Sequence, residues 1–327
     1  MVSEMINQET VTAMLLGHAV GDAMGVPVEL ASRWRLEDNP VTEMRGYGAH
    51  AQPPGSWSGD TSLTIATMDS LSRRKIFDYE DIMCNFVNWY SGNLFTANDI
   101  TFDCDPVTAE AIENFLKGSR PLDSGIGDEY SNENGALIRI SPAVVYIFMT
   151  RGNNFDAEAM TLIHNLAKLT HAHPRTLIAC GIYSLVLAEI FDGQNLQSAI
   201  SNGLNRAKNF YSENPDFKDE WHHYDLFFDK DFANLPEKNI VSRVYVVDNL
   251  KAALWCLLNT DNYRDLILKA VNLGGDADTI AAISGGMAGA FYGLEQIPAE
   301  WLAVLRKKDY LEKIAADFYN TFAKEMY

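Results

Sequence analysis

The sequence predicts an all-α protein folded as a single compact, multi-helix domain over residues 1–327. Three observations lead to this prediction. Apolar residues recur three and four positions apart along most of the chain, which is typical of amphipathic helices. No segment shows the sustained apolar–polar alternation of a half-buried strand. Neither an internal repeat nor a low-complexity segment divides the chain, and its 47% hydrophobic residues allow a sizeable core.

Breaks in the helical pattern set the expected helix boundaries. Pro27 ends the first helix, because proline has no N–H to continue it. Clustered glycines and prolines predict an irregular loop over residues 36–60. The expected helices cover residues 10–24, 62–71, 79–90, 107–116, 136–149, 157–169, 175–191, 196–210, 244–258, 265–271 and 280–292, with one or two closing helices within 297–327.

Residues 211–243 mix charged residues with many aromatic ones, such as Trp221 and Phe228. That many aromatic side chains bury apolar surface. We therefore interpret the segment as an ordered surface excursion within the domain. Its adjacent histidines, His222 and His223, are expected at the surface and pointing apart, because neighbouring side chains diverge.

The charge balance excludes some partners. With 26 basic and 44 acidic residues, the net charge is −18, which argues against nucleic-acid binding and against an anionic membrane. An anionic substrate would need local help from a metal ion, helix N-termini or a few arginines. The four scattered cysteines form neither a disulfide framework nor a zinc motif. Residues 1–10 are polar and no apolar run reaches about 20 residues, so we expect a soluble, cytoplasmic protein.

Two stretches rich in small residues indicate close helix packing. Glycines recur four apart from Gly17 to Gly25, and the predicted helix 280–292 contains three more. Glycine costs about 1 kcal/mol relative to alanine inside a helix, so these positions need a packing reason. Just before the second stretch stand Asp276, Asp278 and Thr279, whose oxygens suit a hard cation.

Acidic residues stand at three expected helix ends. They are Glu29, Asp60 beside Ser58, and the pair Asp276 and Asp278. Oxygen-only ligands select Mg²⁺, Mn²⁺ or Ca²⁺ over zinc. The alternative is that Asp60 and Asp276 merely cap their helices. Three such clusters in a glycine-rich setting favour a cation site.

The sequence resembles the ADP-ribosylglycohydrolases, a family that includes the dinitrogenase-reductase-activating glycohydrolase and the ADP-ribosyl-acceptor hydrolases. The resemblance runs nearly end to end. It implies an all-helical domain with two Mg²⁺ or Mn²⁺ ions in a central cleft, which removes ADP-ribose from a modified side chain or a small acceptor. The motifs that carry it are residues 21–29, residues 57–61, residues 134–137 with Arg139 and Pro142, Thr170-His171, and residues 274–279.

The resemblance also assigns roles to residues. It implies that Glu29 and Asp103 act at the scissile ribose, with Asp60 as a third catalytic carboxylate. Such carboxylates, with a metal, would stabilise the oxocarbenium character of the transition state. The implied metal ligands are Ser58, Asp60, Asp276, Asp278 and Thr279. The implied substrate contacts are Asn134, Gly135, Arg139, Tyr245, Gly274 and Gly275.

Some of these assignments have alternatives. Arg139 could neutralise a buried carboxylate instead of binding the ligand. Tyr245 could stack on adenine. For His171 and His173, which flank an expected helix start, hydrogen bonding across a loop is a better explanation than catalysis.

Three positions depart from the family pattern. Gly59 stands where an aspartate ligand is expected, while Asp105 and Val244 replace glycines. Asp105 could supply a replacement carboxylate. Gly59 is compatible with an engineered substitution, a one-metal hydrolase, or a protein that binds ADP-ribose without turnover. The main hypothesis is a metal-dependent hydrolase acting on an ADP-ribosylated protein, most plausibly at arginine, or on a small molecule; the alternative is a binding module.

Overall fold

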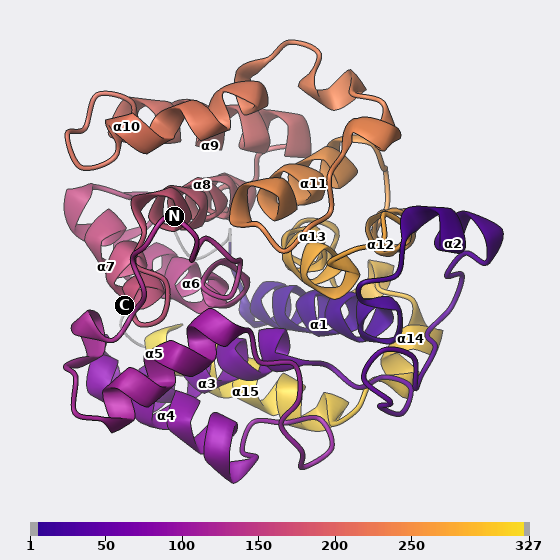
Figure 1. Cartoon of the computed structure of the whole chain (residues 1–327), viewed down its shortest axis with the longest axis horizontal. Helices are drawn as coiled ribbons and strands as arrows, with labels where there is room; N and C mark the ends of the chain where they lie inside the picture. Colours follow the sequence, from indigo (N-terminus) through magenta and orange to yellow (C-terminus); the bar gives the residue numbers. More distant parts are fainter. Residues whose placement is uncertain (1–5, 324–327) are drawn as a thin grey trace.

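The computed structural model describes residues 6–323, and in that range the protein is built from helices with no β-strand (Figure 1). The prediction of an all-α fold is confirmed. The α-helices are α1 (Gln8–Gly25), α2 (Arg33–Asp38), α3 (Gly59–Arg74), α4 (Tyr79–Gly92), α5 (Pro106–Leu116), α6 (Ser141–Arg151), α7 (Ala157–Lys168), α8 (Pro174–Phe191), α9 (Leu196–Tyr211), α10 (Lys218–Trp221), α11 (Val246–Leu258), α12 (Tyr263–Asn272), α13 (Ala277–Tyr292), α14 (Ala299–Val304) and α15 (Lys308–Ala323). Short 3₁₀ helices include η2 (Val26–Val28) and η4 (Leu137–Arg139).

Helices α1 and α13 lie together at the centre of the molecule (Figure 1). They run antiparallel, since Gly17 meets Gly285 and Gly21 meets Ala281 further back along α13. A Cβ added to Gly21 would lie 2.1 Å from the carbonyl oxygen of Ala281, so only glycine allows this approach. This contact is the packing reason expected for the small residues. It also places the start of α13 beside the end of α1.

Two neighbouring glycines of α13 provide a test of this packing. A Cβ on Gly285 would lie 2.4 Å from the carbonyl oxygen of Gly17, whereas the nearest atom to a Cβ on Gly286 is 3.5 Å away. Gly285→Ala should therefore push the helices apart and lower the melting temperature by about 5 °C or more. The matched variant Gly286→Ala should be neutral or stabilising, because alanine favours a helix by about 1 kcal/mol. Thermal unfolding of both variants measures the difference, and equal melting temperatures would contradict the packing argument.

One connected cluster of buried apolar side chains extends from Ile6 to Phe322. By length and composition, Gln8–Val28 and α8 could each cross a membrane, but 89% and 94% of their apolar windows are buried inside the protein. They are core helices of this cluster.

The segment 211–243 contributes aromatic side chains to the same core, as its composition predicts. Trp221 and Tyr224 are buried, and the Tyr224 hydroxyl donates to the carbonyl oxygen of Arg175 at 2.5 Å. His222 is exposed as expected. The rings of His222 and His223 do not point apart, however, because their centroids are 4.0 Å apart. Consecutive residues in a 3₁₀ helix can bring their rings together in a way that an extended chain cannot.

The structure differs from the predicted helices at two places. Residues 136–149 form η4 followed by α6 rather than one helix, because Pro142 has no N–H and stands in the first turn of α6. Helix α2 was not predicted, since its six residues are too few for a clear apolar periodicity.

Candidate metal centre and active site

The first turn of α3 is fixed by a carboxylate from α1. Asp22 is fully buried and accepts hydrogen bonds from the Ser58 N–H at 3.0 Å, the Thr61 N–H at 3.1 Å and the Thr61 hydroxyl at 2.6 Å. The Ser58 hydroxyl caps the helix by accepting from the Asp60 N–H at 3.1 Å. These bonds satisfy the free N–H groups of the helix start. The Asp60 carboxylate is therefore not the cap of α3.

The start of α13 carries the second acidic group. Asp276 occupies the N-cap position, but its side chain makes no capping bond. Its carboxylate instead accepts from the side-chain amides of Asn134 and of Asn249, the latter at 2.6 Å. The Thr279 hydroxyl lies close to both Asp60 and Asp276 and can donate its single proton to one of them at a time. The structure thus brings the α3 and α13 clusters together, and helix capping does not account for either aspartate.

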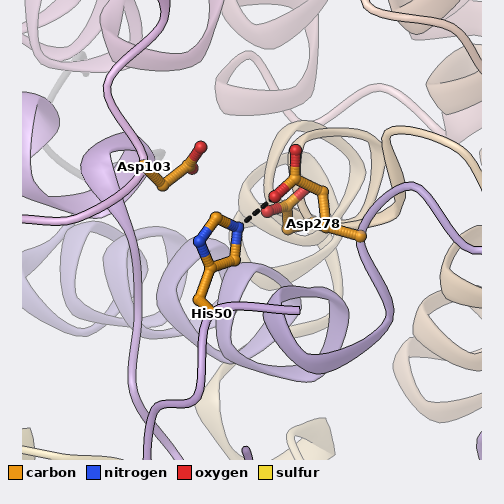
Figure 2. Close-up of side chains that lie close together, drawn as sticks. His50, Asp103 and Asp278 are labelled. Carbon is orange, nitrogen blue, oxygen red and sulfur yellow. Dashed lines mark hydrogen bonds and ion pairs between the residues drawn. The ribbon is translucent and has the colours of Figure 1, made fainter. Parts of the chain in front are cut away.

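Glu29 and Asp103 approach this centre from loops. Glu29 follows η2, and Asp103 precedes α5 in the left-handed conformation, with φ 54°. His50 also reaches the centre, and its Nε2 contacts the Glu29 carboxylate. Figure 2 shows the His50 ring between Asp103 and Asp278. Ligand atoms of Glu29, His50, Asp103 and Asp278 all lie within 4.8 Å of one another.

The carboxylates face a cavity of about 310 Å³. It is lined by residues near the starts of α3 and α13, by Trp89 of α4, and by residues of the segments after η2 and before α5, η4 and α11. Asp60, Asp103, Asp276 and Thr279 all belong to its wall, with Glu29 and Leu30 at its edge toward the next cavity.

Burial makes the carboxylates of this site hard to ionise. It raises the pKa of Asp276 and of Asp103 to about 7, and neighbouring carboxylates add to both effects. Burial also raises the pKa of Asp60 and of Asp278 well above the ordinary range. The hydrogen bond that the His50 ring donates to the Glu29 carboxylate is the main cause that raises the pKa of His50. Without a cation, the site holds protons that a cation would replace.

The donor atoms fit a hard divalent cation. Oδ2 of Asp60 and Oδ2 of Asp278 are buried and have no hydrogen-bond partner among residues 6–323. Unpartnered carboxylate oxygens are costly in a protein interior unless a cation binds them. The hydroxyls of Ser58 and Thr279 add neutral oxygens nearby. Oxygen donors of this kind suit Mg²⁺ or Mn²⁺.

Gly59 is a close-contact position. A Cβ there would lie 2.4 Å from the backbone oxygen of Asp103 and 3.1 Å from the Trp89 ring. The Asp103 segment therefore occupies the space that a side chain at residue 59 would need. In this structure an aspartate at residue 59 could enter only if Asp103 moved.

This contact predicts the effect of substituting Gly59. Gly59→Ala should displace the Asp103 backbone and lower the catalytic efficiency of this site by about 10- to 100-fold, since a shift near 1 Å has effects of that size. Gly59→Asp should give no gain over Gly59→Ala. Gly92→Ala is the control, because no atom lies within 4 Å of a Cβ there. A rate for Gly59→Asp above that of the unmodified protein would show instead that a missing carboxylate limits the site.

The predicted substrate contacts divide into two groups. Asn134 and Gly135 line the cavity, whereas Arg139, Tyr245, Gly274 and Gly275 do not. Arg139 is fully buried and donates to the Leu166 carbonyl at 2.9 Å and to the Thr170 hydroxyl at 2.6 Å, which places it in the core rather than at a ligand. Among residues 6–323 it forms no direct ion pair, although the nearby charge of Asp105 favours its protonated form. The structure therefore does not place Arg139 at the ligand, whereas its attraction to Asp105 agrees with the alternative role near a carboxylate.

The other three residues of that group lie outside the cavity wall. The Tyr245 ring lies beside Arg175, whose Cζ is 6.0 Å from the centroid of the ring. Gly274 and Gly275 have φ values of 69° and 64°. The Gly275 carbonyl accepts from the Leu30 N–H at 2.6 Å, so these glycines hold the Glu29 segment against α13 rather than making room for a ligand.

Sequence reasoning missed three residues of the centre: Asp22 as an organising carboxylate, His50, and Asn249. Asp22 lies inside the motif of residues 21–29, which gives it no separate role. His50 lies in the irregular loop, and Asn249 in an apolar helix. A polar residue fully buried on the apolar face of α11 was the available signal for Asn249.

Known proteins with similar sequences belong to the family that the sequence motifs indicate. The sequence model of the ADP-ribosylglycohydrolase family matches residues 3–326. The chain is 28% identical to the ADP-ribosylarginine hydrolase Tri1 of Serratia proteamaculans, over 99% of this chain and 83% of that protein. It is 29% identical to the ADP-ribosyl-dinitrogen reductase glycohydrolase of Rhodospirillum rubrum, over 90% of this chain and 89% of that protein.

A solved structure described as an ADP-ribosylglycohydrolase-related protein complex shares the fold. Its TM-score is 0.76 at 29% identity, over 96% of this chain and 98% of that chain. The chain therefore belongs to the ADP-ribosylglycohydrolase family, and it is a glycosidic-bond hydrolase.

Proposed function

We propose that the protein hydrolyses the N-glycosidic bond between ADP-ribose and an arginine side chain, with a divalent cation bound by the residues around Asp60 and Asp278. The observation that carries this proposal is the pair of buried, unpartnered oxygens on these two aspartates, which lie in the first turns of α3 and α13. Asp60 also lines the central cavity. The acidic wall also suits a cationic guanidinium on the acceptor side. Similarity to an ADP-ribosylarginine hydrolase supports the same acceptor.

The side chains can be given roles in the reaction. Ser58, Asp60, Asp276, Asp278 and Thr279 would hold Mg²⁺ or Mn²⁺, which would supply positive charge next to the ribose and the diphosphate. Glu29 and Asp103 face the same space and would stabilise positive charge on the ribose as the bond breaks.

Hydrolysis adds the hydroxyl of water to the ribose and a proton to the departing guanidine nitrogen. Asp103 lies in the cavity wall, where its carboxylate could pass that proton from the water to the nitrogen.

A neighbouring cavity supports binding of a diphosphate. It has a volume of about 380 Å³ and shares Glu29 and Leu30 with the central cavity. Arg35 and Arg45 line it. In a protein with a net charge of −18, two arginines beside the reaction site provide local positive charge that an anionic substrate needs.

An assay for release of ADP-ribose tests the proposal. The full-length protein is incubated with ADP-ribosylarginine or ADP-ribosylserine, each with Mg²⁺, with Mn²⁺, or with a chelator. We expect release with either cation, faster from arginine, and none with the chelator. Release that is unaffected by chelation would contradict the cation's role.

The alternative is a protein that binds ADP-ribose without turnover, and Gly59 is the feature that favours it. Isothermal titration with ADP-ribose distinguishes the two. Binding of ADP-ribose combined with no release from any acceptor, at any cation concentration, would establish the binding module and exclude the hydrolase.

A further inference from the structure

A second group of ionisable side chains lies at and behind the cavity wall, apart from Asp60, Asp276 and Asp278; two of its members line the cavity and the third is buried behind them. Asp105 precedes α5, Glu133 lies in the loop before η4, and His171 lies between α7 and α8. Ligand atoms of these three residues lie within 4.8 Å of one another. His171 Nε2 is 3.7 Å from Oδ1 of Asp105.

Buried polar atoms in this group lack partners. His171 Nε2, Glu133 Oε2 and Thr108 Oγ1 form no hydrogen bond with any group of residues 6–323. His171 and Thr108 are both 0% exposed. An unpaired buried polar atom costs about 1–3 kcal/mol, so three in one place indicate a ligand that satisfies them.

The acidic charge of this group is not neutralised by a direct ion pair in the described part of the chain, and the buried Arg139 guanidinium attracts Asp105 only at longer range. Among residues 6–323, no lysine or arginine forms an ion pair with Asp105 or Glu133. Burial and the neighbouring Asp105 raise the pKa of Glu133 to about 7, because the two carboxylates crowd each other. A water molecule would satisfy hydrogen bonds but would not offset this charge, whereas a cation does both.

Gly135 marks the point on which these atoms converge. A Cβ added to Gly135 would lie 2.4 Å from Asp105 Oδ2 and 2.9 Å from both His171 Cε1 and Thr108 Oγ1. The glycine thus leaves room in the wall where any larger residue would collide with the polar atoms.

A metal-binding histidine usually has its other ring nitrogen hydrogen-bonded to a neighbouring group, and His171 has such a neighbour. Arg139 donates to the Thr170 hydroxyl oxygen at 2.6 Å, and that oxygen lies 2.8 Å from His171 Nδ1. The oxygen has two lone pairs, so it can also accept from Nδ1–H, which leaves the lone pair on Nε2. Burial lowers the pKa of His171 to about 4, so the ring is neutral at pH 7.

We propose that Asp105, Glu133 and His171 bind a divalent transition-metal ion, at a site separate from the oxygen ligands on α3 and α13. The Thr108 hydroxyl lies in the same group and offers a further oxygen. One imidazole with carboxylate oxygens favours Mn²⁺ or Zn²⁺ over Mg²⁺, which prefers oxygen alone. This inference does not depend on the proposed reaction.

Binding of Mn²⁺ to the metal-free full chain tests this site. Electron paramagnetic resonance measures the bound ion, and pulsed spectra report coupling to a nitrogen ligand. We expect a Mn²⁺ population with nitrogen coupling. Glu133→Gln should weaken its binding about tenfold or more, and His171→Gln should remove the coupling. His50→Gln and Asp276→Asn should leave this population unchanged.

The variants also separate the two metal proposals. If Asp276→Asn removes all Mn²⁺ and Glu133→Gln removes none, the site of Asp105, Glu133 and His171 does not exist, while the centre on α13 stands. Nitrogen coupling that is lost in His50→Gln and persists in His171→Gln would equally overturn the assignment, because the nitrogen ligand would then be His50. His171 is buried, so Glu133→Gln, at a half-buried position and nearly the same shape, is the deciding variant, with thermal unfolding to verify its fold.

Discussion

Asp278→Asn should lower kcat/KM for ADP-ribosylarginine by about a thousandfold while leaving the metal-free protein as stable as before, or more stable. Asp278 is 1% exposed, and its Oδ2 has no partner among residues 6–323. Burial and the charges of four nearby carboxylates raise the pKa of Asp278. Removing the charge relieves repulsion in the metal-free fold. It also removes an oxygen that the cation and the reaction need. Steady-state kinetics and thermal unfolding in a chelator measure the two effects.

Asp22→Asn is the matched control for this prediction. Asp22 is equally buried, but its two carboxylate oxygens accept bonds from Ser58 and Thr61. Its substitution should lower both stability and activity, since hydrogen bonds to a charged group contribute about 1.5–3 kcal/mol. If Asp278→Asn also lost stability in the chelator, the carboxylate would be a structural group rather than a cation ligand.

The metal-free protein should lose stability as the pH rises from about 6 to 8, and Mg²⁺ or Mn²⁺ should raise the melting temperature far more at pH 8 than at pH 6. Folding raises the pKa of Asp276 and Asp103 from 3.8 to about 7, so the folded state holds protons that the unfolded chain has released. The stability from these groups is complete below their ordinary pKa and is lost as the pH passes through 7. A cation replaces the protons and removes the loss.

Melting temperatures with and without the cation, across this pH range, measure the effect. Buried His18 and His164 have lowered pKa values of about 4 and about 3 and act in the opposite direction, but they contribute equally with and without the cation. The difference between the two curves therefore isolates the ionisable groups at the cation site, which are the carboxylates and His50. A stabilisation by the cation that is the same at pH 6 and pH 8 would contradict the proposed proton exchange.

The sequence predicted most of the helices and the convergence of Glu29, Asp60 and Asp278, because each lies at the end of a strongly periodic segment. It could not predict His50, whose place at the centre depends on a loop with left-handed backbone at Tyr47 and Ala51 and on packing of its ring against Phe102. Long-range contacts of this kind have no local signal.

The outcome at residue 59 shows a second limit. The sequence revealed that a carboxylate is absent there, but not that the Asp103 backbone fills the space. Arg139 is a motif residue that was expected at the ligand. In the structure it instead donates to Thr170 and supports the loop that carries His171. Both facts depend on three-dimensional neighbours rather than on residue type.

The backbone contact between α1 and α13 has a consequence for how this protein can vary. Their register is set by main-chain atoms meeting at Gly17, Gly21 and Gly285, with no side chains between them that could be exchanged for others of similar volume. We call these three positions the glycine seam. None of its residues can be replaced by a smaller one, and any larger residue moves Asp278 relative to Glu29. Mutational tolerance should therefore be lowest along this glycine seam and rise toward the loops, which leaves acceptor preference free to diverge while the spacing of the carboxylates stays constant.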